Sequence, residues 1–358
     1  MKLPVLTTIL PKKVKAKLHD NPLLLIKNLR VYDKNNNIIL NNISLKLYEN
    51  EIYGIVGETG SGKSILANLI LGVENDFFIE KGEIILDGID VTNFKRSDWI
   101  KSKLRGKTIG YFMQSNFLML DPNLKIWFQI IEEELLKNKK DKNYKNKLLI
   151  KASDLLESFN FKNSYVVLNS YPHELSNFEL RKIALLIIIF SKPKLIILDE
   201  IFMNLNLMER NEMIKILKLI QEKNNIGMII ISHDINLISE LASIMGIIYK
   251  GSLVEEGKKE EIMKYPLHPY TWSLIMTIIN EKNAKYFDIF SDDKKHKNFK
   301  NNDNYFSFKN EYSLKIDQFL KPPQFFHTNS HYVYSWIYDK NSPKNLEVSK
   351  LIQDIWNK

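Results

Sequence analysis

Cysteine is absent from the 358-residue sequence, which excludes disulfide bonds and thiolate metal sites. Long apolar runs are missing as well, since none approaches the roughly 20 residues that a membrane-spanning helix needs. The longest, residues 183–190, fits a buried helix. A secretory signal is not expected, because the apolar stretch at residues 5–10 precedes the basic cluster at residues 12–17. We expect a soluble protein on the cytoplasmic side, although the lack of cysteine does not itself identify a compartment.

The composition is otherwise that of a globular protein, with 44% hydrophobic residues and a length that suggests about two or three domains. The formal net charge is +9. Lysine, asparagine and isoleucine are used heavily throughout, so we give this charge no weight as evidence for a nucleic-acid partner. A basic surface suits nucleic acid and an anionic membrane equally well. Composition alone leaves the partner open.

The most informative segment is a glycine-rich loop between a short apolar strand, residues 52–56, and an apolar helix, residues 65–71. It matches the pattern G-x-x-x-x-G-K-[ST], whose glycines let backbone N–H groups converge on a phosphate at a helix N-terminus. Lys63 would reach the β- and γ-phosphates, and the Ser64 hydroxyl would bind Mg²⁺. A glycine-rich turn without function is the alternative. The predicted phosphate-binding residues are Gly57, Glu58, Thr59, Gly60, Ser61, Gly62, Lys63 and Ser64.

An acidic pair, Asp199 and Glu200, follows the apolar strand at residues 195–198. At the carboxyl edge of the sheet beside the glycine-rich loop, Asp199 would hold Mg²⁺ through water. Glu200 would face the attacking water as general base or as the group that positions it. Taken alone, such a pair is more often a helix N-cap. The glycine-rich loop in the same chain favours the catalytic interpretation.

Three further candidate site residues lie in or next to predicted strands. His233 follows the apolar run at residues 228–231 and would meet the γ-phosphate, whereas a histidine taken alone would favour a purely structural role. Gln114 ends the run at residues 109–113. Tyr32 precedes the glycine-rich loop and would stack on a base, the alternative being an exposed strand tyrosine.

Coarser patterns indicate how the chain is organised. We expect strands between residues 23 and 47, interrupted by a turn at residues 33–37, and a hairpin at residues 82–90 that turns at Asp87-Gly88. Residues 95–186 are expected to be largely helical. The runs at residues 195–198 and 228–231, separated by a helix at residues 208–221, predict a parallel βαβ unit.

In chain order, six elements of the sequence resemble the A-loop aromatic, Walker A, Q-loop, signature, Walker B and switch histidine of ATP-binding subunits of ABC transporters. They are Tyr32, Gly57–Ser64, Gln114, Leu175-Ser176, Asp199-Glu200 and His233. The resemblance covers about residues 22–276. It implies ATP and Mg²⁺ as cofactors, a Mg²⁺ site that includes Gln114 with Ser64 and Asp199, and catalysis by Gln114, Glu200 and His233.

The same resemblance implies an α/β fold: a P-loop NTPase core of the ABC ATPase type, with an antiparallel β subdomain, a helical subdomain and a small C-terminal extension. The expected divisions are a basic tail at residues 1–20, an ATPase domain at 21–283 with its helical subdomain at about 95–186, and an extension at 284–358. Part of that extension, residues 292–304, is expected to be loop or disordered.

Two finer motifs, Leu267–Thr271 (L-H-P-Y-T) and Tyr171–Leu175, resemble the oligopeptide and dipeptide importer branch. Within it, the greatest likeness is to the D-type ATPase subunits of Sap peptide-uptake systems. The resemblance implies transport-coupled ATP hydrolysis that powers peptide import. The subunit would be peripheral, on the cytoplasmic face of the inner membrane, docked on two transmembrane permease subunits and served indirectly by a periplasmic peptide-binding protein.

The sequence departs from the family in its signature, where L-S-G-G-Q becomes Leu175-Ser176-Asn177-Phe178-Glu179. Phe178 would obstruct the approach of the backbone to the partner's ATP. The D-loop is also unusual and reads Met203-Asn204-Leu205-Asn206. These changes predict a heterodimer with a second, non-identical ABC ATPase subunit. Ser335 stands where a family cysteine is expected, so no iron–sulfur cluster is predicted.

Two other functions are possible on this sequence. One is a non-catalytic nucleotide-binding adaptor in a membrane complex, against which Glu200 and His233 argue. The other is a soluble ABC ATPase acting on nucleic acid. Proteins of that kind usually carry two cassettes, zinc modules or coiled-coil insertions, none of which is visible, so no nucleic-acid partner is expected. The transported peptide cannot be inferred from the sequence.

Overall fold

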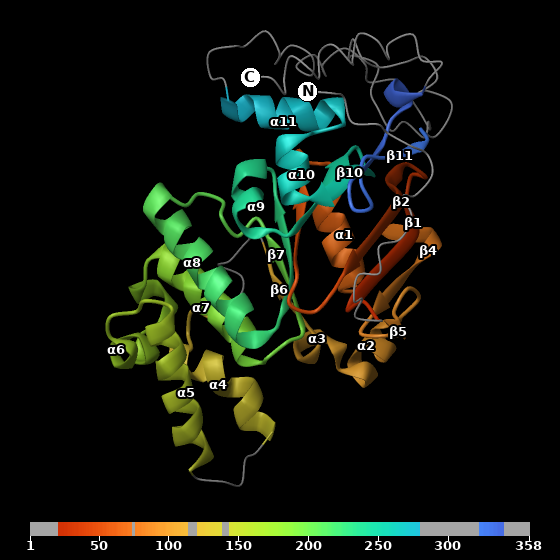
Figure 1. The fold of residues 1–358 in the computed structure, drawn as a ribbon. Helices are drawn as coiled ribbons and strands as arrows, with labels where there is room; N and C mark the ends of the chain where they lie inside the picture. The colour runs from red at the N-terminus through yellow and green to blue at the C-terminus, as the bar shows by residue number, and fades with distance from the viewer. Residues whose placement is uncertain (1–20, 74–75, 114–119, 138–142, 280–321, 340–358) are drawn as a thin grey trace. The chain divides into compact units, whose positions relative to one another are not determined.

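The computed structural model describes residues 21–73, 76–113, 120–137, 143–279 and 322–339 (Figure 1). Two compact units divide the chain. Unit 1 comprises Met1–Tyr48, Ile52–Asn93 and Ser232–Lys358, and unit 2 comprises Glu49–Glu51 and Phe94–Ile231. The predicted basic tail at residues 1–20, Gln114 and residues 292–304 lie outside the described residues.

Unit 1 contains a four-stranded antiparallel sheet in the order β2-β1-β4-β5. Its strands are β1 (Leu24–Asp33), β2 (Ile38–Leu47), β4 (Phe77–Leu86) and β5 (Ile89–Asp90). Asp33 shapes the turn between β1 and β2 by accepting the N–H groups of Asn35 and Asn37, each at 2.8 Å. The sequence correctly predicted this turn and the hairpin of β4 and β5, because both depend on local turn residues.

A second set of strands in unit 1 runs in the order β11-β12-β10-β9-β3. The fully buried β3 (Ile52–Val56) pairs in parallel with β9 (Ile244–Tyr249), which pairs antiparallel with β10 (Ser252–Lys258). Two short C-terminal strands, β12 (Tyr332–Tyr334) and β11 (Gln324–Phe326), extend this set antiparallel to β10. The helices of unit 1 are α1 (Lys63–Ile70), α9 (Ile235–Leu241), α10 (Lys259–Lys264) and α11 (Pro269–Ile279).

Unit 2 contains the parallel strands β6 (Ile109–Phe112), β7 (Leu195–Asp199) and β8 (Gly227–Ser232), in the order β8-β7-β6. Every residue of β7 and β8 is buried, as expected for parallel strands covered on both faces. Helix α8 (Leu207–Asn224) connects β7 to β8, so the predicted βαβ unit is present.

The remaining helices of unit 2 lie mostly between residues 96 and 190, where the sequence predicted helices. They are α2 (Arg96–Ser102), α3 (Leu104–Lys107), α4 (Ile126–Lys137), α5 (Tyr144–Ser158), α6 (Ser164–Asn169), the short 3₁₀ helix η2 (Pro172–Glu174) and α7 (Asn177–Phe190). The apolar run at residues 183–190 forms the largely buried end of α7. Throughout the described ranges, no helix is both long enough and apolar enough to cross a bilayer.

Candidate functional site

The glycine-rich loop joins β3 to α1 in unit 1, and two of its glycines are required by space. A Cβ atom at Gly57 would lie 2.2 Å from the Ile248 carbonyl oxygen, and one at Gly62 would lie 2.7 Å from Leu40 Cδ2. Gly62 is the N-cap of α1 and has a φ of 100°, a conformation that side chains disfavour. The loop can take this shape only because these two positions carry no side chain.

Lys63 places a positive charge within this loop. Its side chain is 6% exposed, and Nζ donates to the carbonyl oxygens of Gly57 and Glu58, each at 2.7 Å. The Ser61 hydroxyl lies 3.4 Å from the same nitrogen. The N-terminus of α1 and this ammonium group form an environment suited to a phosphate group. Ser64 lies exposed in the first turn of α1.

Two other predicted site residues, His233 and Tyr32, also belong to unit 1. His233 is exposed and precedes α9, whose N-cap is Asp234. Tyr32 is half-buried near the end of β1, and the Arg30 guanidinium lies 5.5 Å from its ring centroid. The proposed contacts of these two side chains with nucleotide stay predictions.

Asp199 ends β7 in unit 2 and is 2% exposed. Its Oδ2 accepts a hydrogen bond of 3.3 Å from the Tyr111 hydroxyl on the neighbouring strand β6. Burial, followed by the charge of Asp199, raises the pKa of Tyr111, so the phenol keeps the proton that it donates. Sequence reasoning missed Tyr111, although a hydroxyl in an otherwise apolar strand next to Gln114 was a usable signal.

Glu200 follows Asp199 in a turn with an unusual backbone. Its φ is 51°, in the left-handed region, which costs a residue with a Cβ about 1–2 kcal/mol. The Glu200 N–H donates to the Ile231 carbonyl at 3.0 Å, and its own carbonyl accepts from the Met203 N–H at 3.1 Å. Neither Asp199 nor Glu200 caps the next helix, because the N-cap of α8 is Asn206. The helix-cap alternative for the acidic pair is therefore wrong.

Arg181 on α7 forms hydrogen bonds with the same turn. Its Nη1 donates to the carbonyl oxygens of Ile201 at 2.8 Å and Met203 at 2.7 Å. Burial lowers the pKa of Arg181, and the charge of Glu209 opposes this shift. The sequence offered no sign of this contact, since the residues that meet lie on different elements.

The unusual signature residues form the start of α7. Ser176 is its N-cap and accepts the Glu179 N–H at 3.3 Å, while the Glu179 carboxylate accepts the Ser176 N–H at 2.9 Å. Through this reciprocal capping box, Glu179 stabilises the N-terminus of α7. The Phe178 ring is half-buried, with Lys182 Nζ 5.0 Å from its centroid. Lys182 in turn forms a 2.9 Å ion pair with Glu212 of α8.

The side chains predicted to hold Mg²⁺ are oxygen donors, the type that this ion prefers. The Ser64 hydroxyl belongs to unit 1 and the Asp199 carboxylate to unit 2. No group of three or more histidine, aspartate or glutamate side chains suited to a metal ion occurs within the described residues. The chemistry of each donor taken by itself fits Mg²⁺, and a site formed by both stays a prediction.

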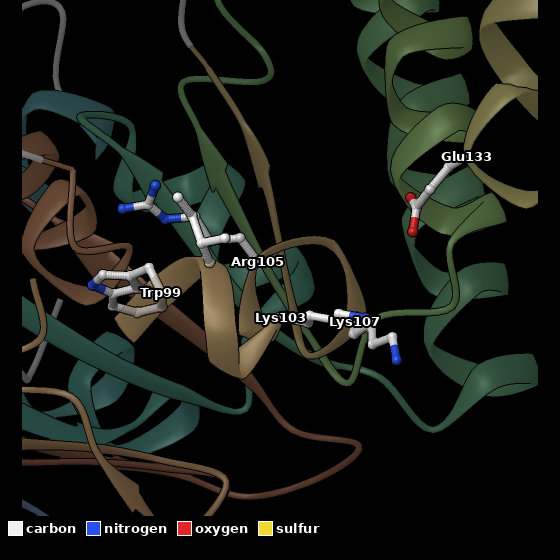
Figure 2. Close-up of a pocket in the computed structure, with 6 residues that line it drawn as sticks. Trp99, Lys103, Arg105, Lys107 and Glu133 are labelled. Carbon is white, nitrogen blue, oxygen red and sulfur yellow. The ribbon is translucent and has the colours of Figure 1, made fainter. Parts of the chain in front are cut away.

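A cavity of about 540 Å³ lies within unit 2, and none of the predicted site residues lines it (Figure 2). Its walls are formed by Trp99, Ile100, Lys103, Arg105, Lys107 and Glu133. Figure 2 shows Arg105 beside Trp99, with the guanidinium 4.9 Å from the ring centroid. The Glu133 carboxylate accepts from the Ser191 hydroxyl at 2.8 Å. The residues that line this cavity belong to none of the motifs described above.

Comparisons with known proteins agree with these observations. Residues 40–203 match the family described as "ABC transporter". The oligopeptide transport ATP-binding protein OppD of Lactococcus lactis subsp. cremoris (strain SK11) is 35% identical over 235 residues, covering 65% of this chain and 68% of OppD. The dipeptide transport ATP-binding protein DppD of L. lactis subsp. cremoris (strain MG1363) is 29% identical over 308 residues, covering 85% of this chain and 87% of DppD.

Solved structures show the same fold. The structure of cbiO1 from Clostridium perfringens has a TM-score of 0.60 at 19% identity, covering 74% of this chain and 97% of that one. A bacterial ABC transporter cassette, solved as a dimer, has a TM-score of 0.56 at 22% identity, covering 66% of this chain and 98% of that one. At these identities the likeness concerns the fold alone, and it confirms the predicted fold class.

Proposed function

The chain belongs to the family of ATP-binding subunits of oligopeptide and dipeptide ABC transporters, and we propose on this basis that it hydrolyses ATP to power peptide import. The single observation that carries the proposal is the loop at residues 57–64. Its two space-limited glycines and the buried ammonium group of Lys63 form a site suited to phosphate.

The roles of the site residues follow from their chemistry. The loop at residues 57–64 binds the phosphates, Tyr32 stacks on the base and His233 contacts the γ-phosphate. Glu200 orients or deprotonates the attacking water, and its restrained backbone supports that role. Ser64, Gln114 and Asp199 would hold Mg²⁺, which supplies positive charge against the transferred phosphoryl group.

The assembly that we infer contains two transmembrane permease subunits and a second, non-identical ATPase. The altered signature supports an asymmetric pair, because Asn177 and Phe178 stand where glycines would allow close approach. Leu207 and Met208, which follow the D-loop at the start of α8, are 72% and 83% exposed. Exposed apolar side chains beside a motif of the interface support contact with a partner ATPase. In this assembly the chain lies on the cytoplasmic face of the inner membrane, and a periplasmic peptide-binding protein delivers the substrate.

The experiment is to co-express this chain with its co-encoded membrane subunits and second ATPase, reconstitute the purified complex and measure peptide-stimulated ATP hydrolysis. Peptide accumulation in vesicles should require ATP and should cease with the Glu200→Gln variant. A complex that binds ATP and assembles, yet hydrolyses equally well with Glu200→Gln, would instead identify this chain as a non-catalytic adaptor.

Within the peptide importers, the irregular signature and D-loop support a Sap-type role in the uptake of antimicrobial peptides. A strain that lacks this chain should become more sensitive to cationic antimicrobial peptides while its uptake of ordinary oligopeptides is unchanged. The opposite pattern, loss of oligopeptide uptake with unchanged sensitivity, would place the chain with the general oligopeptide importers.

A further inference from the structure

The phosphate-binding loop and the L-H-P-Y-T segment are joined by a hydrogen bond. Tyr270, the second residue of α11, is fully buried, and its hydroxyl accepts the Glu58 N–H at 2.8 Å. The carbonyl oxygen of the same residue, Glu58, accepts the Lys63 ammonium at 2.7 Å. One loop residue thus links the tyrosine hydroxyl to the lysine that the proposed function assigns to the phosphates.

Tyr270 makes two further contacts with its surroundings. Its ring centroid lies 4.6 Å from that of Tyr249, and its backbone N–H donates to His268 Nδ1 at 3.1 Å. Burial, followed by the charge of Glu58, raises the pKa of Tyr270, so the hydroxyl stays neutral. The Glu58 N–H of the loop therefore donates to a neutral hydroxyl group.

The segment that carries Tyr270 is anchored by a buried carboxylate. Glu255 on β10 is fully buried and accepts the N–H groups of Leu267 at 2.9 Å and His268 at 2.8 Å. Its third partner is His331, which is also fully buried and whose Nε2 lies 2.8 Å away. Because a carboxylate only accepts, this nitrogen carries the proton. Leaving any of these groups unpaired in the interior would be costly.

His331 belongs to the C-terminal segment at residues 322–339, which touches the same anchor a second time. The Tyr338 hydroxyl donates to the Leu267 carbonyl oxygen. The contacts form a continuous series from the C-terminal segment through Glu255 and the L-H-P-Y-T turn to the phosphate-binding loop. All of its members belong to unit 1.

We propose that Tyr270 is a positioning residue for the phosphate-binding loop and that the C-terminal segment, through His331 and Glu255, keeps Tyr270 in place. The C-terminal segment thereby adjusts the affinity of the protein for nucleotide. This inference rests on the proposed function, because it assumes that the loop binds the phosphates of ATP.

The test is Tyr270→Phe in the assembled complex, because phenylalanine keeps the ring and its packing while removing the hydroxyl. We expect the Kd for a fluorescent ATP analogue and the KM for ATP to rise roughly 3- to 10-fold, as for the loss of one buried hydrogen bond, with kcat nearly unchanged. Tyr165→Phe is the control for removal of a tyrosine hydroxyl, since Tyr165 is 76% exposed on α6 in unit 2. Wild-type affinity for Tyr270→Phe would overturn the positioning role.

His331→Asn tests the contribution of the C-terminal segment. It should weaken nucleotide binding in the same direction, and the double variant with Tyr270→Phe should lose less than the product of the two single effects. Unchanged affinity in His331→Asn, even with a lowered melting temperature, would limit the role of His331 to stability and overturn that part. If the wild-type complex binds the analogue but does not hydrolyse ATP, the proposed function fails while this binding test still applies.

Discussion

The loop at residues 57–64 and the turn at residues 200–203 carry the two halves of the proposed chemistry, and they are built differently. The loop takes its shape from its own glycines, two of which have no room for a Cβ atom. The turn places Glu200, a residue with a full side chain, at a φ of 51°. Atoms distant in sequence hold it there: the Ile231 carbonyl and the Arg181 guanidinium.

This difference indicates which substitutions should disturb the loop and which should disturb the turn. Changes inside the loop alter the proposed binding surface itself, because the proposed function assigns the phosphate contacts to its backbone and to Lys63. The turn depends on hydrogen bonds from residues distant in the sequence, Arg181 and Ile231. Its geometry can therefore be damaged from α7, with the acidic side chains left unchanged. Binding should respond to the first kind of change and turnover to the second.

The largest effect on nucleotide binding is expected for Lys63→Ala, which tests the loop. The variant loses a buried positive charge whose contacts to phosphate are each worth about 1.5–3 kcal/mol, so the Kd for ATP should rise at least roughly 100-fold. Titration with a fluorescent nucleotide measures this. Lys46→Ala, at an exposed position on β2, is the control and should bind normally. Unchanged affinity in Lys63→Ala would show that the loop is not the phosphate site.

Glu200→Gln tests the turn. The amide keeps the shape of the side chain but cannot take a proton, so ATP binding should persist while turnover of the assembled transporter falls roughly 10²- to 10⁴-fold. Steady-state phosphate release, with binding measured separately, distinguishes the two quantities. The exposed Glu240 on α9 offers a matched Glu240→Gln control with full activity expected.

Arg181→Met separates the turn from its support. Methionine retains the apolar stem but removes both hydrogen bonds to the turn, so we expect turnover to fall roughly 10- to 100-fold with nucleotide affinity unchanged, as for the loss of two hydrogen bonds. Arg181→Lys should recover part of the loss, and Lys218→Met on the exposed side of α8 should have no effect. Equal losses in binding and turnover would contradict the comparison between loop and turn.

The smallest effect is expected at the altered signature. Ser176→Ala removes the N-cap of α7 and should lower the free energy of unfolding by about 1 kcal/mol, with little change in transporter turnover.

Changing the signature serine of the second ATPase should reduce turnover far more. The isolated chain should be a very weak ATPase. Strong activity from the purified chain alone, with the concentration dependence of a homodimer, would rule out the asymmetric pair.

Much of the fold and of the binding loop could be predicted because the responsible signals are local. Glycine spacing identified the loop, alternating hydrophobicity at residues 43–47 identified part of β2, and the Asp87-Gly88 pair identified the hairpin of β4 and β5. The run at residues 195–198 and its partner at residues 228–231 predicted the parallel pair of β7 and β8. Periodicity and turn chemistry act over a few residues, so a single chain displays them.

The amino-acid sequence by itself determined the strand–loop–helix that we propose as the phosphate site, the acidic pair at the end of β7 and the order of the motifs that identify the family. Tertiary structure alone decided which residues support them. Tyr111 meets Asp199 across 88 residues, Tyr270 meets Glu58 across 212, and His331 meets Glu255 across 76. Such hydrogen bonds carry no local signature, because their partners are brought together only when strands pair and helices pack around a common core.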